Sequence, residues 1–145
     1  MLYCRASTAT QSVPMPHQQI AEALDDHAAW KATIMSALAD GAPQDFIQAV
    51  PRPDACAFGK WLGSSENSHE LRHSPRFHEA ARLHAKFHDV AARTLLHVIE
   101  GRPTEAVRAL SHRGEFTAAI RSFTTHAEAW LRELALEESQ VAAVA

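Results

Sequence analysis

The stretch LHAKFHD, residues 83–89, places two histidines four positions apart in a segment that has the apolar pattern of a buried helix. A helix turns about 100° per residue, so His84 and His88 lie on the same side of it. The other residues on that side are apolar: Phe77, Ala81, Ala91, Leu95 and Val98. The pattern predicts a long helix over residues 74–100 with two imidazoles in the middle of its buried face.

The rest of the chain is also predicted to be helical. There are only five glycines, and no alternating strand pattern is found. The expected helices cover residues 17–40, 44–50, 55–62, 74–100 and 104 onward, the last of which bends or breaks at Gly114. The apolar stripe of this last helix is Ala106, Leu110, Phe116, Ile120, Phe123, Ala127, Leu131 and Leu134. Three long helices and two short ones predict an all-α fold, an antiparallel helical bundle similar to a four-helix bundle.

Length and composition limit the function classes. With 145 residues, the chain is most simply one domain with a single core. A formal net charge of −3, without a long basic cluster, argues against a nucleic-acid partner. No apolar run approaches the roughly 20 residues of a membrane-spanning helix, and the first residues lack the apolar core of a signal peptide. We therefore expect no membrane association and a cytoplasmic location, where the two cysteines stay reduced.

A third histidine lies at the centre of another predicted buried stripe. Ile20 and Ile34 are each seven residues from His27, so all three lie within about 20° of one line along their helix. A buried polar group without a partner costs on the order of 1–3 kcal/mol, so buried imidazoles need partners. His84 and His88 are spaced to hold one metal ion together, and His27 would provide a third ligand.

Cys56 is the candidate for the fourth ligand. It lies in DACAFGKWL, residues 54–62, two positions after Asp54, which we expect to cap the helix that follows. In the first turn of that helix the amide dipoles would favour a thiolate. Three imidazoles and one thiolate are a common ligand set for zinc, whereas calcium and magnesium prefer oxygen. The alternative is four unrelated core residues, each satisfied by a backbone carbonyl or a water molecule.

HELRH, residues 69–73, matches the short H-E-x-x-H pattern of zinc proteases. It follows the loop-like SSENS and is closed off by Pro75, which leaves little room for a helix. The longer protease motif would need a glycine and a histidine where the chain has Arg76 and Glu79. We therefore expect a solvated loop or a short turn here. His17, His97, His112 and His126 are expected at the surface or at the rim of the core.

Taken together, the proposed ligand segments resemble the chemoreceptor zinc-binding domain family, called CZB. The likeness rests on HAAWK (27–31), the C-x-F-G-K-W-L segment (56–62) and H-x-x-F-H (84–88), and it covers about residues 17–135. Position by position, the family's zinc site of three histidines and one cysteine falls on His27, Cys56, His84 and His88. The resemblance thus implies the same Zn2+ site that the helix stripes select independently.

The resemblance also implies a function. The family is helical, tends to form homodimers, and sits on cytoplasmic chemoreceptors or diguanylate cyclases, where it senses zinc or oxidants such as hypochlorous acid. Residues 17–138 would be the zinc-binding domain, 1–16 a flexible N-terminal arm, and 139–145 a C-terminal tail. We expect a regulatory domain that is not an enzyme. Because the sequence shows neither a methyl-accepting coiled coil nor a cyclase domain, it would signal through a chemoreceptor or a diguanylate cyclase in trans, have a simpler role than signalling, or be a piece of a longer protein.

Residues beside the four ligands are expected to pack around the metal and exclude water. This set consists of Trp30, Phe58, Gly59, Trp61 and Phe87, of which the glycine would permit a close helix approach. Cys4, in the arm, is expected to be a spare thiol.

Three other classes of function remain open: a hemerythrin-like iron or oxygen carrier, a hydrolase with catalytic zinc, and a metal-free interaction bundle. Bridging carboxylates, which diiron chemistry needs, are missing from the predicted ligand faces, and four protein ligands would leave no position for a catalytic water.

Overall fold

The structure is a computed structural model that describes residues 15–144. The predicted arm therefore lies almost entirely outside the described residues, and so does Cys4. The described residues contain helices and no strand. The helices are α1 (Pro16–Asp40), α2 (Gln44–Ala49), α3 (Ala57–Leu62), α4 (His69–His73), α5 (Pro75–Ile99), α6 (Pro103–Leu110) and α7 (Glu115–Val144).

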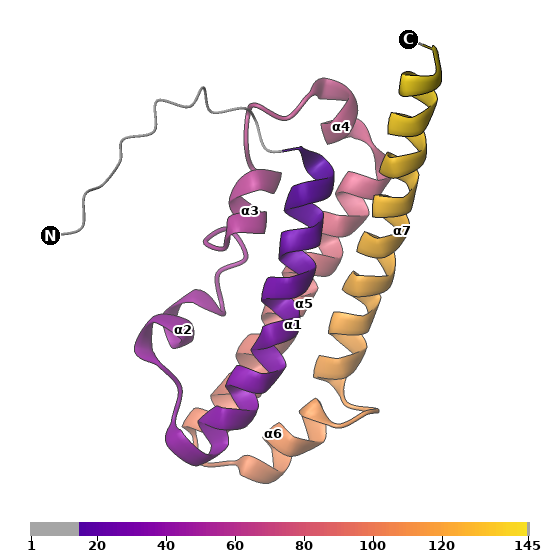
Figure 1. The fold of residues 1–145 in the computed structure, drawn as a ribbon. Coiled ribbons are helices and arrows are strands. Elements are labelled where there is room, and N and C mark those ends of the chain that lie inside the picture. Colours follow the sequence, from indigo (N-terminus) through magenta and orange to yellow (C-terminus); the bar gives the residue numbers. More distant parts are fainter. Residues whose placement is uncertain (1–14, 145) are drawn as a thin grey trace, which may run out of the picture.

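The three long helices form the body of the molecule (Figure 1). α1 and α5 run in one direction, while α7 returns in the opposite direction and packs along both of them. The segment from α2 to α3 runs back along α1 and takes the place of a fourth, irregular helix. The predicted all-α antiparallel bundle is therefore confirmed, although seven helices occur between residues 15 and 144 where five were expected.

The core consists of two apolar clusters. One contains Phe58, Trp61, Phe77 and Trp130, and the other is built around Ile34, Phe87, Leu95 and Phe116. The ring of His27 lies 5.7 Å from Phe123 of the first cluster and 5.5 Å from Phe87 of the second, measured between centroids. The predicted histidine stripes therefore meet where the two apolar clusters join.

The last predicted helix is broken into α6 and α7, and Gly114 is the reason. A Cβ atom at this position would lie 2.0 Å from the carbonyl oxygen of Ala109, so only glycine allows the chain to turn back this closely. Beyond the turn, α7 continues through residues 139–144, the segment expected to be a separate tail. The exposed residues of this end include Leu136, Val141 and Val144.

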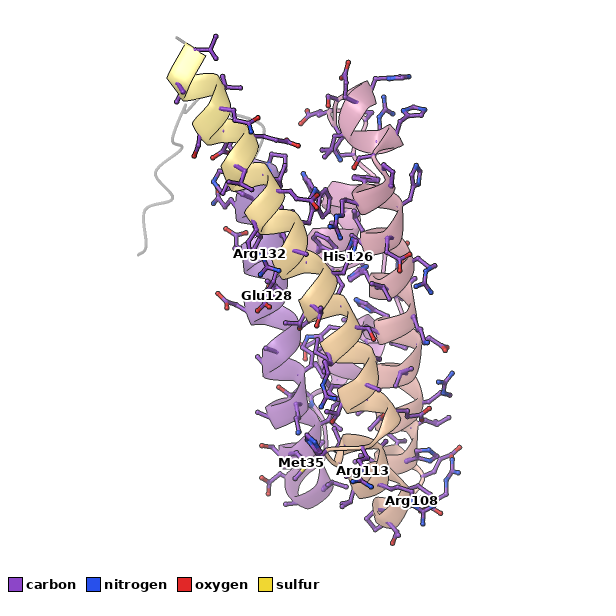
Figure 2. The ribbon with its side chains drawn as sticks, turned by 90° about the vertical axis from the view of Figure 1, so that its right-hand side faces the viewer. Met35, Arg108, Arg113, His126, Glu128 and Arg132 are labelled. Carbon is purple, nitrogen blue, oxygen red and sulfur yellow. The ribbon has the colours of Figure 1, made fainter. Side chains whose placement is uncertain are left out.

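Polar side chains fix α7 against the start of α5. His126 lies on the side of α7 that faces α5, whereas Glu128 and Arg132 lie toward α1 (Figure 2). The Nε2 atom of His126 lies 2.9 Å from the carbonyl oxygen of Arg76, and the guanidinium of Arg76 binds Glu133. α7 is thus tied to the start of α5 by polar contacts at the rim of the apolar core.

HELRH forms a helix, α4, and the expectation of a loop or turn was wrong. Ser68 caps it, because its hydroxyl oxygen accepts a hydrogen bond from the amide of Leu71 at 3.1 Å. Pro75 does not interfere, since it is the first residue of α5 and needs no amide hydrogen there. Within residues 15–144, none of the helices is long and apolar enough to cross a membrane.

Candidate metal centre

Four side chains converge in the middle of the bundle. His27 comes from α1, Cys56 from the residue before α3, and His84 and His88 from consecutive turns of α5. One nitrogen of each ring and the cysteine sulfur all lie within 4.8 Å of one another. Nε2 of His27 is 3.3 Å from Nε2 of His88, and Sγ of Cys56 is 3.2 Å from Nε2 of His84. We call this group the His3Cys cluster.

Two of the rings are held by backbone carbonyls that fix their tautomer. Nδ1 of His27 lies 2.7 Å from the carbonyl oxygen of Ala23, and Nδ1 of His88 lies 2.8 Å from that of Val50. A carbonyl oxygen only accepts hydrogen bonds, so in both rings Nδ1 carries the hydrogen and donates it. Each Nε2 is therefore left with a lone pair, and the two lone pairs face each other at 3.3 Å. Two facing lone pairs repel each other and are favoured when both nitrogens bind one cation, and hydrogen bonds from Nδ1 to carbonyls are the usual way in which proteins orient histidines toward a metal.

Cys56 has a structural role that the sequence did not reveal. It is the N-cap of α3, because its sulfur accepts a hydrogen bond from the amide of Gly59 at 3.3 Å. The expectation that Asp54 caps this helix was wrong. A Cβ atom at Gly59 would lie 1.6 Å from the carbonyl oxygen of Pro53, so this glycine lets the loop before α3 close against the helix and bring the sulfur inward.

Burial keeps the three imidazoles neutral, which is the form that binds metals. It lowers the pKa of His84 to about 3, with smaller contributions from His88 and His27, and it lowers the pKa of His88 to about 4. The pKa of His27 is also lowered by burial, against the effect of the bond to Ala23. No imidazolium is therefore expected in the cluster near pH 7.

Burial also has the largest effect on the pKa of the Cys56 thiol. It raises the pKa of the Cys56 thiol, while the amides of Gly59 and Phe58 lower it by a smaller amount. The expectation that the helix amides favour a thiolate is thus only partly met, because desolvation outweighs them. A divalent cation in the cluster would reverse this balance, since it binds the thiolate and displaces the proton.

The donor set fits zinc, and so do the two shortest distances between its atoms. Zn–N bonds of about 2.0–2.1 Å at a tetrahedral centre put two nitrogens roughly 3.3–3.4 Å apart, and Zn–S of about 2.3 Å puts sulfur and nitrogen about 3.6 Å apart. The nitrogens of His27 and His88, at 3.3 Å, have the first spacing, and the sulfur and nitrogen of Cys56 and His84, at 3.2 Å, are near the second. The cluster contains a thiol and no carboxylate, so it does not match a hemerythrin-like diiron centre.

Aromatic side chains enclose the cluster. The ring of Trp30 lies 4.8 Å from that of His88, Phe58 lies 5.0 Å from His84, and Phe87 lies 5.5 Å from His27, measured between ring centroids. Trp61 lies one layer further out, because its aromatic contacts are with Phe58, Phe77 and Trp130.

Sequence reasoning placed Phe123 in the core but not beside the cluster, where it contacts both His27 and His84. It also missed Trp130, which is 3 % exposed. The seven-residue spacing from Phe116 to Phe123 and then to Trp130 could have indicated that these three residues share one face. The predicted stripe instead contains Leu131 and Leu134, which are only half-buried.

The other histidines lie outside the cluster. His69 and His73 stack on each other at 3.9 Å on the exposed face of α4. His17 and His112 are exposed, and His97 and His126 are half-buried, as expected for surface and rim positions.

Fold and site define a class of protein: a helical-bundle domain with one buried zinc-type cluster of three histidines and one cysteine. Residues 27–95 match the family model of the Chemoreceptor zinc-binding domain, CZB, and the four cluster residues all fall within this span. The chain therefore carries a domain of the CZB family, and the family and the cluster together support zinc as its cofactor. No curated protein and no solved structure matches the chain.

Proposed function

We propose that this chain is a regulatory zinc-binding domain in which the zinc-bound sulfur of Cys56 reports either zinc level or oxidants such as hypochlorous acid. The observation that carries the proposal is the pair of facing lone pairs on His27 and His88, next to a thiol and a third neutral imidazole. With four protein ligands on one ion, no position is left for a catalytic water. We therefore propose a sensor and not an enzyme.

The double role of Cys56 supports a switching mechanism. The same sulfur caps α3 and would bind zinc, so a change at this one atom acts on the helix and on the metal together. α3 has only six residues and depends on tertiary contacts for its stability. Loss of zinc or modification of the sulfur would loosen α3, whereas α1, α5 and α7 remain packed through their apolar faces.

Oxidation would act on the sulfur, because zinc itself has no redox chemistry here. The thiolate attacks the chlorine of hypochlorous acid, so that an S–Cl bond forms, the O–Cl bond breaks and hydroxide leaves. Water then displaces chloride from the sulfur, and the product is a sulfenic acid that thiols can reduce again. A sulfenic acid is a weaker ligand than a thiolate, so zinc would be released. Whether the domain senses zinc or an oxidant depends on the affinity of the His3Cys cluster for zinc. A titration against a chelator of known affinity measures it.

Metal analysis tests the core of the proposal. Protein purified without chelators should contain about one zinc per chain, and Cys56→Ala should retain clearly less. Cys4→Ala removes the other cysteine and should leave the zinc content unchanged. A wild-type protein without zinc, or a Cys56→Ala variant that holds zinc as tightly as wild type, would contradict the proposal.

The redox version has its own test. Limiting hypochlorous acid added to the zinc-loaded protein should release zinc in step with modification of Cys56, followed by a chromogenic chelator and by peptide mass spectrometry. If Cys56 stays unmodified and the zinc content is unchanged, oxidant sensing is contradicted and zinc level is the signal.

We further propose that the domain acts in the cytoplasm as a homodimer and passes its signal to a chemoreceptor or a diguanylate cyclase in trans. The chemoreceptor association in the family's description supports the proposed partner. The homodimer rests on the resemblance to CZB proteins, which tend to form homodimers. Sedimentation of the zinc-loaded protein at several concentrations tests the dimer. A monomer at all concentrations would contradict it.

A further inference from the structure

The His3Cys cluster is approached from one side by a groove. This groove has a volume of about 450 Å³, and its walls come from α1, from α2 through Phe46, and from the start of α3. Among the residues that line it are His27 and Cys56, whereas His84 and His88 do not contribute to its lining. These two histidines are 2 % and 0 % exposed, so the cysteine side of the cluster is the side open to solutes.

The lining of the groove carries one sign of charge. Of the ten described residues that line it, the two with a formal charge near pH 7 are Asp25 and Asp26, both exposed. Neither side-chain carboxylate takes part in a hydrogen bond or an ion pair within residues 15–144, so neither is directly paired with a described residue. Asp26 acts electrostatically on both Cys56 and His27, which places its charge within reach of the cluster.

We propose that this groove is the route by which small reactants reach the sulfur of Cys56, and that Asp25 and Asp26 make it select uncharged or cationic reactants over anionic ones. The inference rests on the proposed function, because it assigns the chemical class of reactant to the same sulfur. For an oxidant that exists as an acid and its anion, the neutral acid is the form admitted. Zinc ions, being cationic, are drawn toward the cluster by the same carboxylates.

The size of the effect follows from Coulomb's law. A unit charge about 7 Å from an anion in water changes its local concentration by roughly threefold, and two such charges by roughly fivefold to tenfold at low salt. Salt of a few tenths molar would screen most of this difference.

Iodoacetamide and iodoacetate form a matched pair of probes, because they have nearly the same size and differ in charge. In both reactions the sulfur forms a bond to the CH2 carbon, the carbon–iodine bond breaks, and iodide leaves with the bonding electrons. Second-order rates at Cys56 of the zinc-loaded protein are followed by peptide mass spectrometry, which separates Cys56 from Cys4. The ratio of the two rates isolates the effect of charge, because any change in sulfur reactivity affects both reagents.

Asp25→Asn/Asp26→Asn should raise the iodoacetate rate about fivefold to tenfold at low salt and leave the iodoacetamide rate within about twofold. The matched control is Asp40→Asn, which removes the same charge from the same helix about 20 Å away and should leave the ratio unchanged. In wild type, added salt should raise the iodoacetate rate, an effect that needs no variant. An unchanged ratio in the double variant, or no salt effect in wild type, would overturn the inference.

The two failures can be told apart. If metal analysis finds no zinc, the proposed function fails, and the charge selection is still measured on the free thiol. If zinc is present and the ratio does not respond to the aspartates or to salt, the groove proposal fails alone.

Discussion

The imidazole of His88 has two roles, because one nitrogen binds the backbone and the other faces the metal site. It is 0 % exposed, its Nδ1 donates to Val50, and its Nε2 faces His27. His88→Ala should therefore lose most of the bound zinc and also destabilise the metal-free protein by about 3 kcal/mol, because it leaves a cavity and an unpaired carbonyl. Zinc content and urea denaturation measure the two effects. His112→Ala, at an exposed position, is the control, and a His88→Ala protein as stable and zinc-rich as this control would contradict the expectation.

The buried histidines also predict how the metal-free protein responds to acid. The pKa of His84 is about 3 and that of His88 about 4 in the folded chain, against 6.5 for a free side chain. Below pH 6.5 the unfolded chain therefore binds more protons than the folded one, so the free energy of unfolding falls as the pH falls toward 4. Urea denaturation of chelator-treated protein between pH 7.5 and 5 should show this decline, and His84→Leu should reduce its slope. A flat profile would show that the imidazoles are not neutral and buried.

At the scale of single elements, α3 is the most sensitive helix because its start is fixed by a backbone contact. Gly59→Ala would force a Cβ atom against the carbonyl of Pro53 and should destabilise the protein by about 1–3 kcal/mol, with weaker zinc retention. Gly63→Ala, at the other end of the same helix, meets atoms no closer than 3.6 Å and should be nearly neutral. Chemical denaturation and metal analysis compare the pair. Equal stability of the two variants would show that the loop before α3 is not packed as closely as described.

The helices should also respond unequally to metal removal. Zinc would hold the start of α3 through Cys56, whereas the second half of α5 is packed by apolar residues such as Val90, Ala91 and Leu95. Hydrogen exchange should therefore speed up in α3 on chelation much more than in α5. A uniform change along the chain would indicate global destabilisation and would contradict a local switch.

How far the sequence predicts these elements depends on what it encodes locally. His27, His84 and His88 could be placed because helical periodicity fixes the face of each residue in a long helix. α4 was missed because its five residues make too few turns for an apolar pattern to show. The helix α3 itself was predicted, but its cap was not. By residue type Asp54 is a better cap than cysteine, and the acceptors at Ala23 and Val50 are backbone atoms that no side-chain pattern reveals.

For the whole molecule, the helical bundle was predictable because three long amphipathic helices must bury their apolar faces against one another. The segments between them contain α2, α3, α4 and α6, and how these short helices pack was not predictable from the pattern. The sequence predicts that the last helix bends or breaks at Gly114. That it breaks follows from the close approach of the turn to Ala109, which the sequence does not show. The groove over Cys56 could not be foreseen, since it depends on how α2 and α3 lie against α1. Tertiary packing of short segments thus decides what the sequence pattern leaves open.

Zinc should stabilise the molecule as a whole, because an ion that binds only the folded state shifts the folding equilibrium. With free zinc at about a thousand times its dissociation constant, the gain is roughly 4 kcal/mol, which corresponds to a rise in Tm of roughly 10 °C for a domain of this size. Thermal denaturation followed by circular dichroism, before and after chelation, measures the difference. An identical Tm in both samples would show that the cluster does not bind zinc in the folded chain.

The most direct measurement is X-ray absorption at the zinc edge on the purified protein. If His27, Cys56, His84 and His88 hold one ion, the spectrum will show one sulfur at about 2.3 Å and three nitrogens at about 2.0 Å. A protein without zinc, or a zinc shell that contains no sulfur, would contradict the central claim.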